Sequence, residues 1–354
     1  MKRTLILVFA LFCTLVVAKV AAEEVSGLYS GQISVADQTE KSRKSGVRDA
    51  LAQVLIKLTG NSNIMQVPGI QEAVSNTDNY VAGVGYKSLP AEPGELPKTE
   101  LQVSFSRQAI DHLIRWAQLP ILPSDRPKLL IWIVRDDPES GRQFVSAESL
   151  ADFIKQFDSH MDQRGMPYRL PDFDLEDQLA LSVNQAWGLQ ETAIELASQR
   201  YASDGWALLR FFTTATGEAR GAWMYQVADG RGFNDVRGEN TELFVSLAVN
   251  DLVDSLSAQF TYIPQTDTSE LVVQINQVDS YADYQAVISQ LKKLELVQSL
   301  NVVAVKGGRL FLTLNIEGGV DLLESALVRS GRLENQTSQA SRFSGNLEFD
   351  WIVK

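Results

Sequence analysis

The sequence is poor in cysteine and histidine, with one cysteine and two histidines among 354 residues. Cys13 lies in an apolar N-terminal stretch that we expect to be removed, so the mature chain has no disulfide and must rely on its hydrophobic core. His112 and His160 have no ligand-type residue at a zinc spacing, and both are interpreted as ordinary surface or capping residues. We therefore expect no cysteine nucleophile, no metal site and no cofactor.

Positive charge is also scarce, because 32 lysines and arginines face 44 acidic residues and the formal net charge is −12. Such a surface is repelled by nucleic acid and by anionic lipid, so neither is an expected partner. The sequence lacks a Walker phosphate loop and a Gly-x-Ser-x-Gly nucleophile elbow. Ser289 and Lys292 have the spacing of a lysine-activated serine, but a solvated helix surface explains them better.

The first residues have the pattern of a secretory signal peptide. Lys2 and Arg3 precede an apolar run over residues 5–18, and residues 20–22 are small enough for a cleavage site. The run is shorter than the ~20 residues of a spanning helix, so we predict a cleaved signal over 1–22 rather than an uncleaved anchor. Cleavage removes three basic residues and leaves a charge of −15. No later run is long enough to span a membrane, and a bacterial periplasm is the expected location.

Breaks in composition divide the mature chain into three small mixed units, which predicts an α+β or α/β fold class. The first unit covers 23–122 and ends before a proline cluster. The second covers 128–263 and includes an antiparallel hairpin. A polar stretch then leads into the third unit, 269–354.

The first unit is predicted to centre on a long helix. Asp37 and Glu40 have the spacing of a capping box at its start, and Gly60 accepts the left-handed turn that ends it. Strands are predicted over 33–35, 80–89 and 99–106, with a closing helix over 107–118.

The second unit opens on six apolar residues, Leu129–Val134, which is typical of a strand covered on both faces. Asp136 and Asp137 follow it, at the edge where open α/β sheets bind ligands. An acidic pair there suits a cationic ligand, although a strand-ending turn explains the same residues. The other elements predicted are helices over 147–163, 175–185, 189–201 and 241–260 and strands over 206–214 and 223–227.

The third unit carries the clearest fold signal. Asp279 and Ser280 offer side-chain oxygens to the free N–H groups of a helix start, and Gly307 and Gly308 tolerate the positive φ of a two-residue hairpin turn. The predicted order is a strand over 271–278, a helix, strands over 302–305 and 310–314, a second helix after Gly319 and a last strand over 347–351. This order is the ferredoxin-like βαββαβ unit.

Several segments together resemble a domain-of-unknown-function family of secreted proteins from Gram-negative bacteria. They are the signal peptide, the helix segment 47–51 with its end at 58–61, the strand 129–134, and the segment 278–281. The resemblance spans nearly the whole mature chain, implies a periplasmic location and supplies no activity. The helix pattern of the first unit is also similar to the N-terminal domain of a flagellar H-ring assembly protein.

Two charged clusters are candidate sites. Four basic residues gather at the start of the first long helix: Lys41, Arg43, Lys44 and Arg48. Because cations there oppose the helix dipole, a contact with an anionic partner is one interpretation and a solvated helix face is the other. The acids at 172–177 lack the glycine and glutamate of a calcium loop, so a helix start is the favoured interpretation.

We interpret the protein as a non-enzymatic periplasmic protein that acts by contacts with envelope proteins. A ligand-binding protein with a cleft beside Leu129–Val134 is the alternative, and a hydrolase is the least favoured. Exposed strand edges would favour an assembly role, whereas two convergent carboxylates in a cleft would favour an enzyme.

The signal-peptide prediction is tested by N-terminal sequencing of the protein purified from the envelope fraction. We expect the mature chain to begin at Glu23, because signal peptidase cleaves after small residues. Recovery of a chain that retains Met1 from the cytoplasm would contradict the prediction.

Overall fold

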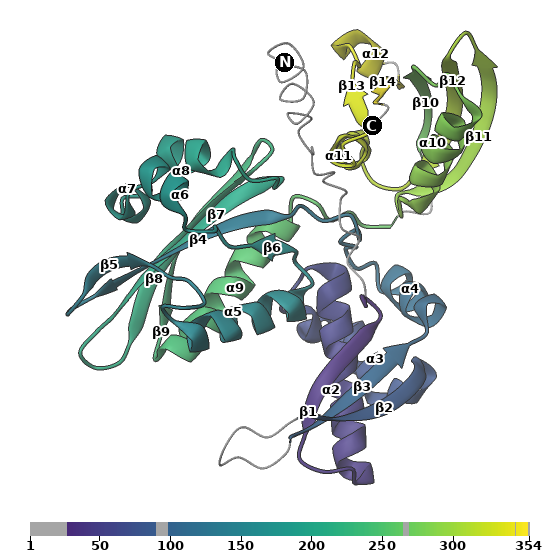
Figure 1. The fold of residues 1–354 in the computed structure, drawn as a ribbon. Coiled ribbons are helices and arrows are strands. Elements are labelled where there is room, and N and C mark those ends of the chain that lie inside the picture. The colour runs from purple at the N-terminus through teal and green to yellow at the C-terminus, as the bar shows by residue number, and fades with distance from the viewer. Residues whose placement is uncertain (1–26, 90–97, 265–268, 344, 353–354) are drawn as a thin grey trace, which may run out of the picture.

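The computed structural model describes residues 27–89, 98–264, 269–343 and 345–352. The predicted signal peptide lies outside this part of the chain. The described residues form three sheets, each with its own helices (Figure 1), which confirms an α+β fold. Among these residues, none of the helices combines the length and the apolar character needed to cross a membrane.

The N-terminal unit is an antiparallel sheet in the order β1-β3-β2, packed against α2. Its elements are β1 (Ser30–Val35), α2 (Glu40–Thr59), a 3-10 turn (Ile64–Gln66), α3 (Pro68–Ser75), a second 3-10 turn (Thr77–Asn79), β2 (Val81–Leu89), β3 (Lys98–Phe105) and α4 (Arg107–Trp116).

The ends of α2 only partly match the sequence prediction. The N-cap is Thr39, whose side chain accepts from Ser42 N, and the predicted capping box at Asp37 is wrong. Asp37 instead accepts hydrogen bonds from the backbone N–H and the hydroxyl of Thr39. The predicted end is confirmed, because Gly60 has a φ of +66° and its N–H donates to Ile56 O.

Strand β1 lies very close to α2 at Gly31. A Cβ on Gly31 would lie 2.8 Å from the Cβ and the carbonyl oxygen of Ala50. Glycine at this position therefore allows the backbones of β1 and α2 to approach each other. A larger residue would push the strand and the helix apart. This contact fixes the free edge of β1 beside the helix.

The central sheet has the strand order β5-β4-β7-β8-β9, and β6 pairs with the start of β4. Its elements are β4 (Leu129–Asp137), β5 (Gly141–Phe144), α5 (Ala151–Arg164), β6 (Tyr168–Arg169), α6 (Leu175–Ala180), α7 (Val183–Trp187), α8 (Glu191–Ser198), β7 (Gly205–Thr213), β8 (Ala219–Val227), β9 (Gly230–Gly238) and α9 (Thr241–Ser257).

The prediction of a doubly covered strand at Leu129–Val134 is confirmed. All six residues are buried, and they alternate between two cores on opposite faces of the sheet. The odd-numbered residues pack under α5 and α9, and the even-numbered ones pack under α7 and α8.

The C-terminal sheet has the order β11-β12-β10-β14-β13. Its elements are β10 (Ser269–Asn276), α10 (Tyr281–Lys293), β11 (Val297–Lys306), β12 (Arg309–Ile316), α11 (Val320–Arg329), β13 (Leu333–Asn335), α12 (Gln339–Phe343) and β14 (Asn346–Trp351). The predicted hairpin turn is confirmed, because Gly307 and Gly308 have φ angles of +61° and +69°.

The second half of this unit departs from the predicted ferredoxin-like order, so that order is not confirmed as a whole. In a ferredoxin-like unit the fourth strand is antiparallel to the first and pairs with it. Here β13, which was not predicted, has that antiparallel direction, but β14 lies between β13 and β10 and runs parallel to β10. A three-residue strand is too short to show a period of two in the sequence. The prediction therefore assigned the closing position to β14 alone.

Leu312 is fully buried in the core of this unit, so Leu312→Ala should leave a cavity. We expect a loss of about 2–5 kcal/mol in the opening free energy, read from amide hydrogen exchange of β10 and β12 in the whole chain. The adjacent Thr313→Ala is the control and should cost less than about 1 kcal/mol. Equal losses for the two variants would contradict the assigned core.

Candidate functional site at the junction of the units

A buried arginine joins the central unit to the N-terminal unit. Arg164 ends α5, and its side chain is 3% exposed. Its Nη2 donates to Asp254 Oδ1 at 2.6 Å and to Gly60 O at 2.8 Å, so one guanidinium holds α9 and the end of α2. Its Nη1 donates to the backbone and side-chain oxygens of Asn250. Burial lowers the pKa of Arg164, and Asp254 opposes this shift.

Asp254 also binds the segment that follows α2. It accepts hydrogen bonds from the backbone N–H of Ser62, at 2.9 Å, and from the Ser62 hydroxyl. A Cβ on Gly60 would lie 2.6 Å from Ser257 Cβ. Gly60 is therefore required both for its left-handed conformation and for the close approach of α9.

A second buried arginine lies beside the first. Arg126 donates to backbone carbonyl oxygens from three segments: Pro123, Lys57 at the end of α2, and Arg164 with Gly165 at the end of α5. Burial lowers the pKa of Arg126 to about 10, and the neighbouring Arg164 acts in the same direction. These carbonyl oxygens take the place of water around the charge.

Ion pairs and a hydrogen bond join the C-terminal unit to the N-terminal unit and to the linking segment. Arg115 Nη1 lies 2.6 Å from Glu317 Oε1, and Arg329 Nε lies 3.0 Å from Asp125 Oδ2. Glu295 accepts from Ser124 N at 3.1 Å. All three units therefore contact the segment around residues 123–126, which links the N-terminal unit to the central unit.

A polar cavity of about 1160 Å³ lies at this junction, and we call it the junction groove. One wall is formed by β1 and α2, and the other by the end of α5, the following residues through Tyr168, and α9. Figure 1 shows the C-terminal end of α5 next to α2. The polar side chains that line it include Ser30, Gln32, Asp49, Gln53, Lys57, His160 and Asp162.

The ionisable groups of the groove lie at different depths. Asp49 and Asp162 are exposed, whereas Lys57 and His160 are half-buried. Burial lowers the pKa of both Lys57 and His160, and Asp162 partly opposes the shift at Lys57. From the sequence His160 is interpreted as an ordinary surface or capping residue, because nothing in its spacing places it in a cavity. Lys57 likewise has the sequence signature of an ordinary last-turn helix lysine.

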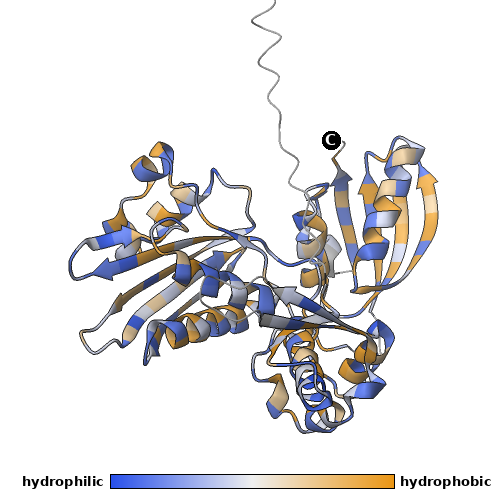
Figure 2. Ribbon diagram, turned by 60° about the horizontal axis from the view of Figure 1, so that its bottom comes forward, coloured by the Kyte–Doolittle hydropathy of each residue, from blue (hydrophilic) through white to orange (hydrophobic). Residues whose placement is uncertain are grey.

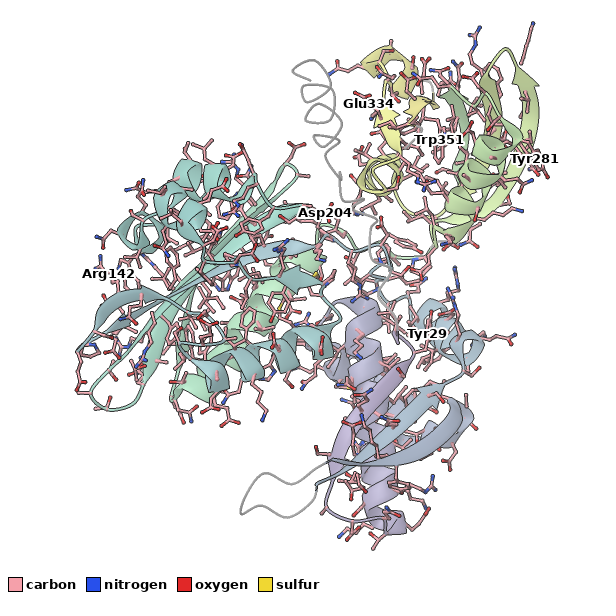
Figure 3. All side chains as sticks on the ribbon, viewed as in Figure 1. Tyr29, Arg142, Asp204, Tyr281, Glu334 and Trp351 are labelled. Carbon is pink, nitrogen blue, oxygen red and sulfur yellow. The ribbon has the colours of Figure 1, made fainter. Side chains whose placement is uncertain are left out.

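Asp136 and Asp137 lie in the hairpin between β4 and β5. Asp136 Oδ2 is 3.1 Å from Arg142 Nε. Asp137 accepts from the N–H and the hydroxyl of Ser140, and backbone hydrogen bonds lower its pKa. Figure 3 shows Arg142 at the outer end of the central unit, away from Tyr29 in the N-terminal unit. The junction groove lies at the opposite end of β4, so this structure does not bring the acidic pair to it.

The predicted basic cluster lies at the other end of α2 from the groove. Lys41, Lys44 and Arg48 are exposed and Arg43 is partly buried. Glu40 lies 2.9 Å from Arg43 Nη2 and 3.6 Å from Lys44 Nζ, so it offsets part of the positive charge. Binding of an anionic partner by this cluster stays a prediction.

The acids near residue 174 form a helix start, as favoured. Asp174 is the N-cap of α6 and accepts from Asp177 N. Arg200 lies 2.6 Å from Asp174 and 2.9 Å from Asp177, and it holds the pKa of Asp174 well below its usual range. In the part of the chain that the structure describes, no group of three or more His, Cys, Asp or Glu residues is arranged to hold a metal ion.

Strand β11 is exposed along its length. Its strongly exposed apolar residues are Val303 at 65%, Val305 at 58% and Val302 at 42%. Figure 2 shows hydrophobic colour on this outer strand of the C-terminal sheet. Within the described residues β12 is its only strand neighbour.

Removing the buried guanidinium should destabilise the junction. We expect Arg164→Ala to lower the opening free energy of α2 and α5 by about 3 kcal/mol, because Asp254 then lacks its ion-pair partner and Gly60 O lacks a donor. Amide hydrogen exchange of the whole chain measures this change.

The matched control is Arg231→Ala, which removes an exposed arginine 2.7 Å from Glu191. An exposed pair of this kind contributes less than about 1 kcal/mol. If the two variants lose similar stability, Arg164 does not hold the units together.

Comparisons with known proteins reach only part of the chain. No curated protein matches it. A solved structure described as that of an uncharacterized protein is 7% identical, over 37% of this chain and 88% of that one, with a TM-score of 0.16. Residues 22–123 match a family described as a domain of unknown function (DUF8605), in agreement with an uncharacterised family.

Proposed function

We propose that this is a secreted periplasmic protein that acts without catalysis, by binding an extended segment of another envelope protein along β11. The observation that carries the proposal is the open edge of β11 with its exposed valines. The predicted signal peptide supports the location. The predicted similarity of the first unit to a flagellar H-ring assembly protein agrees with an assembly role and stays a prediction.

Two of the exposed valines of β11, Val302 and Val305, continue the buried face of the sheet, whereas Val303 lies at a register shift and has no cross-strand partner. Val302 pairs with Leu312, and Val305 pairs with Leu310. Cross-strand partners point to the same face, so these valines extend the row of buried leucines beyond the cover of the helices. A further strand with apolar residues on that face would complete this core.

The backbone of β11 also has free pairing capacity on its open side. In a two-residue hairpin the residues next to the turn, Lys306 and Arg309, form the hydrogen-bonded closing pair. The groups of Val305, one residue further, therefore point away from β12. An added strand would bind there through main-chain hydrogen bonds, as in β-augmentation.

Charge favours a segment of a different protein over a second copy. Lys306 and Arg309 stand at the hairpin end of β11 and are exposed. They suit a segment with acidic residues beside its apolar ones. A second copy would bring another strongly acidic chain, whose net charge opposes self-association.

The test is a variant with Val303→Lys and Val305→Lys, used to capture cross-linked partners from an envelope extract. Lysine on an edge strand opposes further pairing, so a partner captured by the wild type should be lost. The stability should change by less than about 0.5 kcal/mol per exposed site.

The control carries Leu179→Lys and Leu196→Lys, which change two exposed apolar residues of the central unit in the same way. It should capture the same partner as the wild type. Loss in both variants, or in neither, would show that β11 is not the contact surface.

A further inference from the structure

The free edge of β1 forms one wall of the junction groove. Among the described residues β3 is its only strand partner. Two backbone groups on the open side already meet side chains of α2. Gln32 N donates to Gln53 Oε1 at 2.9 Å, and Lys57 Nζ donates to Ser30 O at 3.4 Å. The N–H and C=O groups of successive residues in a strand point to opposite sides, so every second residue points the same way. Ser34 therefore presents its N–H and C=O to the open side of β1, as Ser30 and Gln32 do.

The side chains of α2 that face this edge differ in charge from end to end. Asp49, Gln53 and Lys57 follow one another at four-residue steps, so they form a single stripe along the helix. All three line the groove. Asp49 and Lys57 are ~12 Å apart along the helix axis at 1.5 Å per residue. The groove therefore has an acidic end and a basic end.

Two buried arginines, Arg126 and Arg164, add positive charge near the basic end of the groove. Arg126 donates to the backbone carbonyl of Lys57 itself. Arg164 lines the groove, and its buried Nε has no hydrogen-bond partner among the described residues. Burial strengthens charge interactions relative to water, whereas Asp162, the acid that acts on Lys57, is exposed and screened. The half-buried acid of the groove, Glu100, pairs with Ser34 and therefore lies toward the acidic end. The basic end is therefore suited to an anionic group.

We propose that the junction groove binds a short peptide in extended conformation, antiparallel to β1, with its terminal carboxylate at Lys57 and its amino group toward Asp49. An extended chain covers ~12 Å with three or four residues at 3.3–3.6 Å each. Its carbonyl groups take the place of the Gln53 side chain at Gln32 N, as an added strand does. A sugar would match the groove less well, because it has neither the regularly spaced N–H and C=O groups that pair with the edge of β1 nor a charge at each end. This inference is independent of β11.

The test is calorimetric titration of the mature protein with trialanine in three forms: free at both ends, amidated at the carboxyl end, or acetylated at the amino end. Amidation should weaken binding about tenfold or more, because it removes a charge-assisted hydrogen bond to a half-buried lysine. Acetylation should weaken it by a smaller factor of about two to five, because Asp49 is exposed.

Lys57→Met identifies the residue at the carboxylate. The variant should bind free trialanine about tenfold more weakly than the wild type does, and it should bind the amidated form equally well. Equal binding of the amidated form also shows that the groove is folded. Lys41→Met, an exposed lysine at the other end of α2, is the matched control and should leave all three affinities unchanged.

Three results would overturn the proposal as a whole, and a fourth would overturn the assignment of a free peptide. One is the absence of binding for free trialanine, and another is equal binding of the three forms. The third is a loss at Lys57→Met that is as large for the amidated peptide as for the free one. If amidation matters and acetylation does not, the groove binds the carboxyl tail of a protein, and the assignment of a free peptide is wrong.

Discussion

The burial of Arg126 and Arg164 is the constraint on which the arrangement of the units depends. A guanidinium removed from water must find acceptors in fixed positions, and here they come from α2, α5 and α9. Displacing either unit would leave a buried charge without acceptors, which costs more than the loss of an ordinary contact. The junction therefore has one favourable geometry, and that geometry sets the width of the groove above it.

The distribution of charge follows from the same arrangement. The protein is acidic overall, yet its most buried ionisable side chains at the junction are arginines. The hydrogen bonds of Arg126 go to backbone oxygens, whereas Arg164 also pairs with the carboxylate of Asp254. The surface acids near the junction are hydrated and contribute less. The net charge of the chain therefore does not describe the junction, where the most buried ionisable side chains are cations.

Sequence reasoning worked where a pattern is local. The strand Leu129–Val134, the end of α2 at Gly60 and the turn at Gly307 each follow from residues that lie next to one another. It failed at the Thr39 cap, where two acceptor side chains compete within three residues. It also missed the junction, because Lys57, Arg126 and Arg164 are far apart in the chain and each resembles a common surface cation. Their positions at the junction become apparent only when the separate units are packed together.

The insertion of β14 has a consequence for how the C-terminal unit forms. Although β13 precedes β14 in the chain, β14 is its sheet partner and separates it from β10. Among the described residues β14 is the only strand that pairs with β13, so β13 joins the sheet only through β14, either as a β13–β14 pair formed beforehand or after β14 has docked. Because β13 has three residues and one strand neighbour, this rim of the sheet should be the first to lose amide protection when the unit opens.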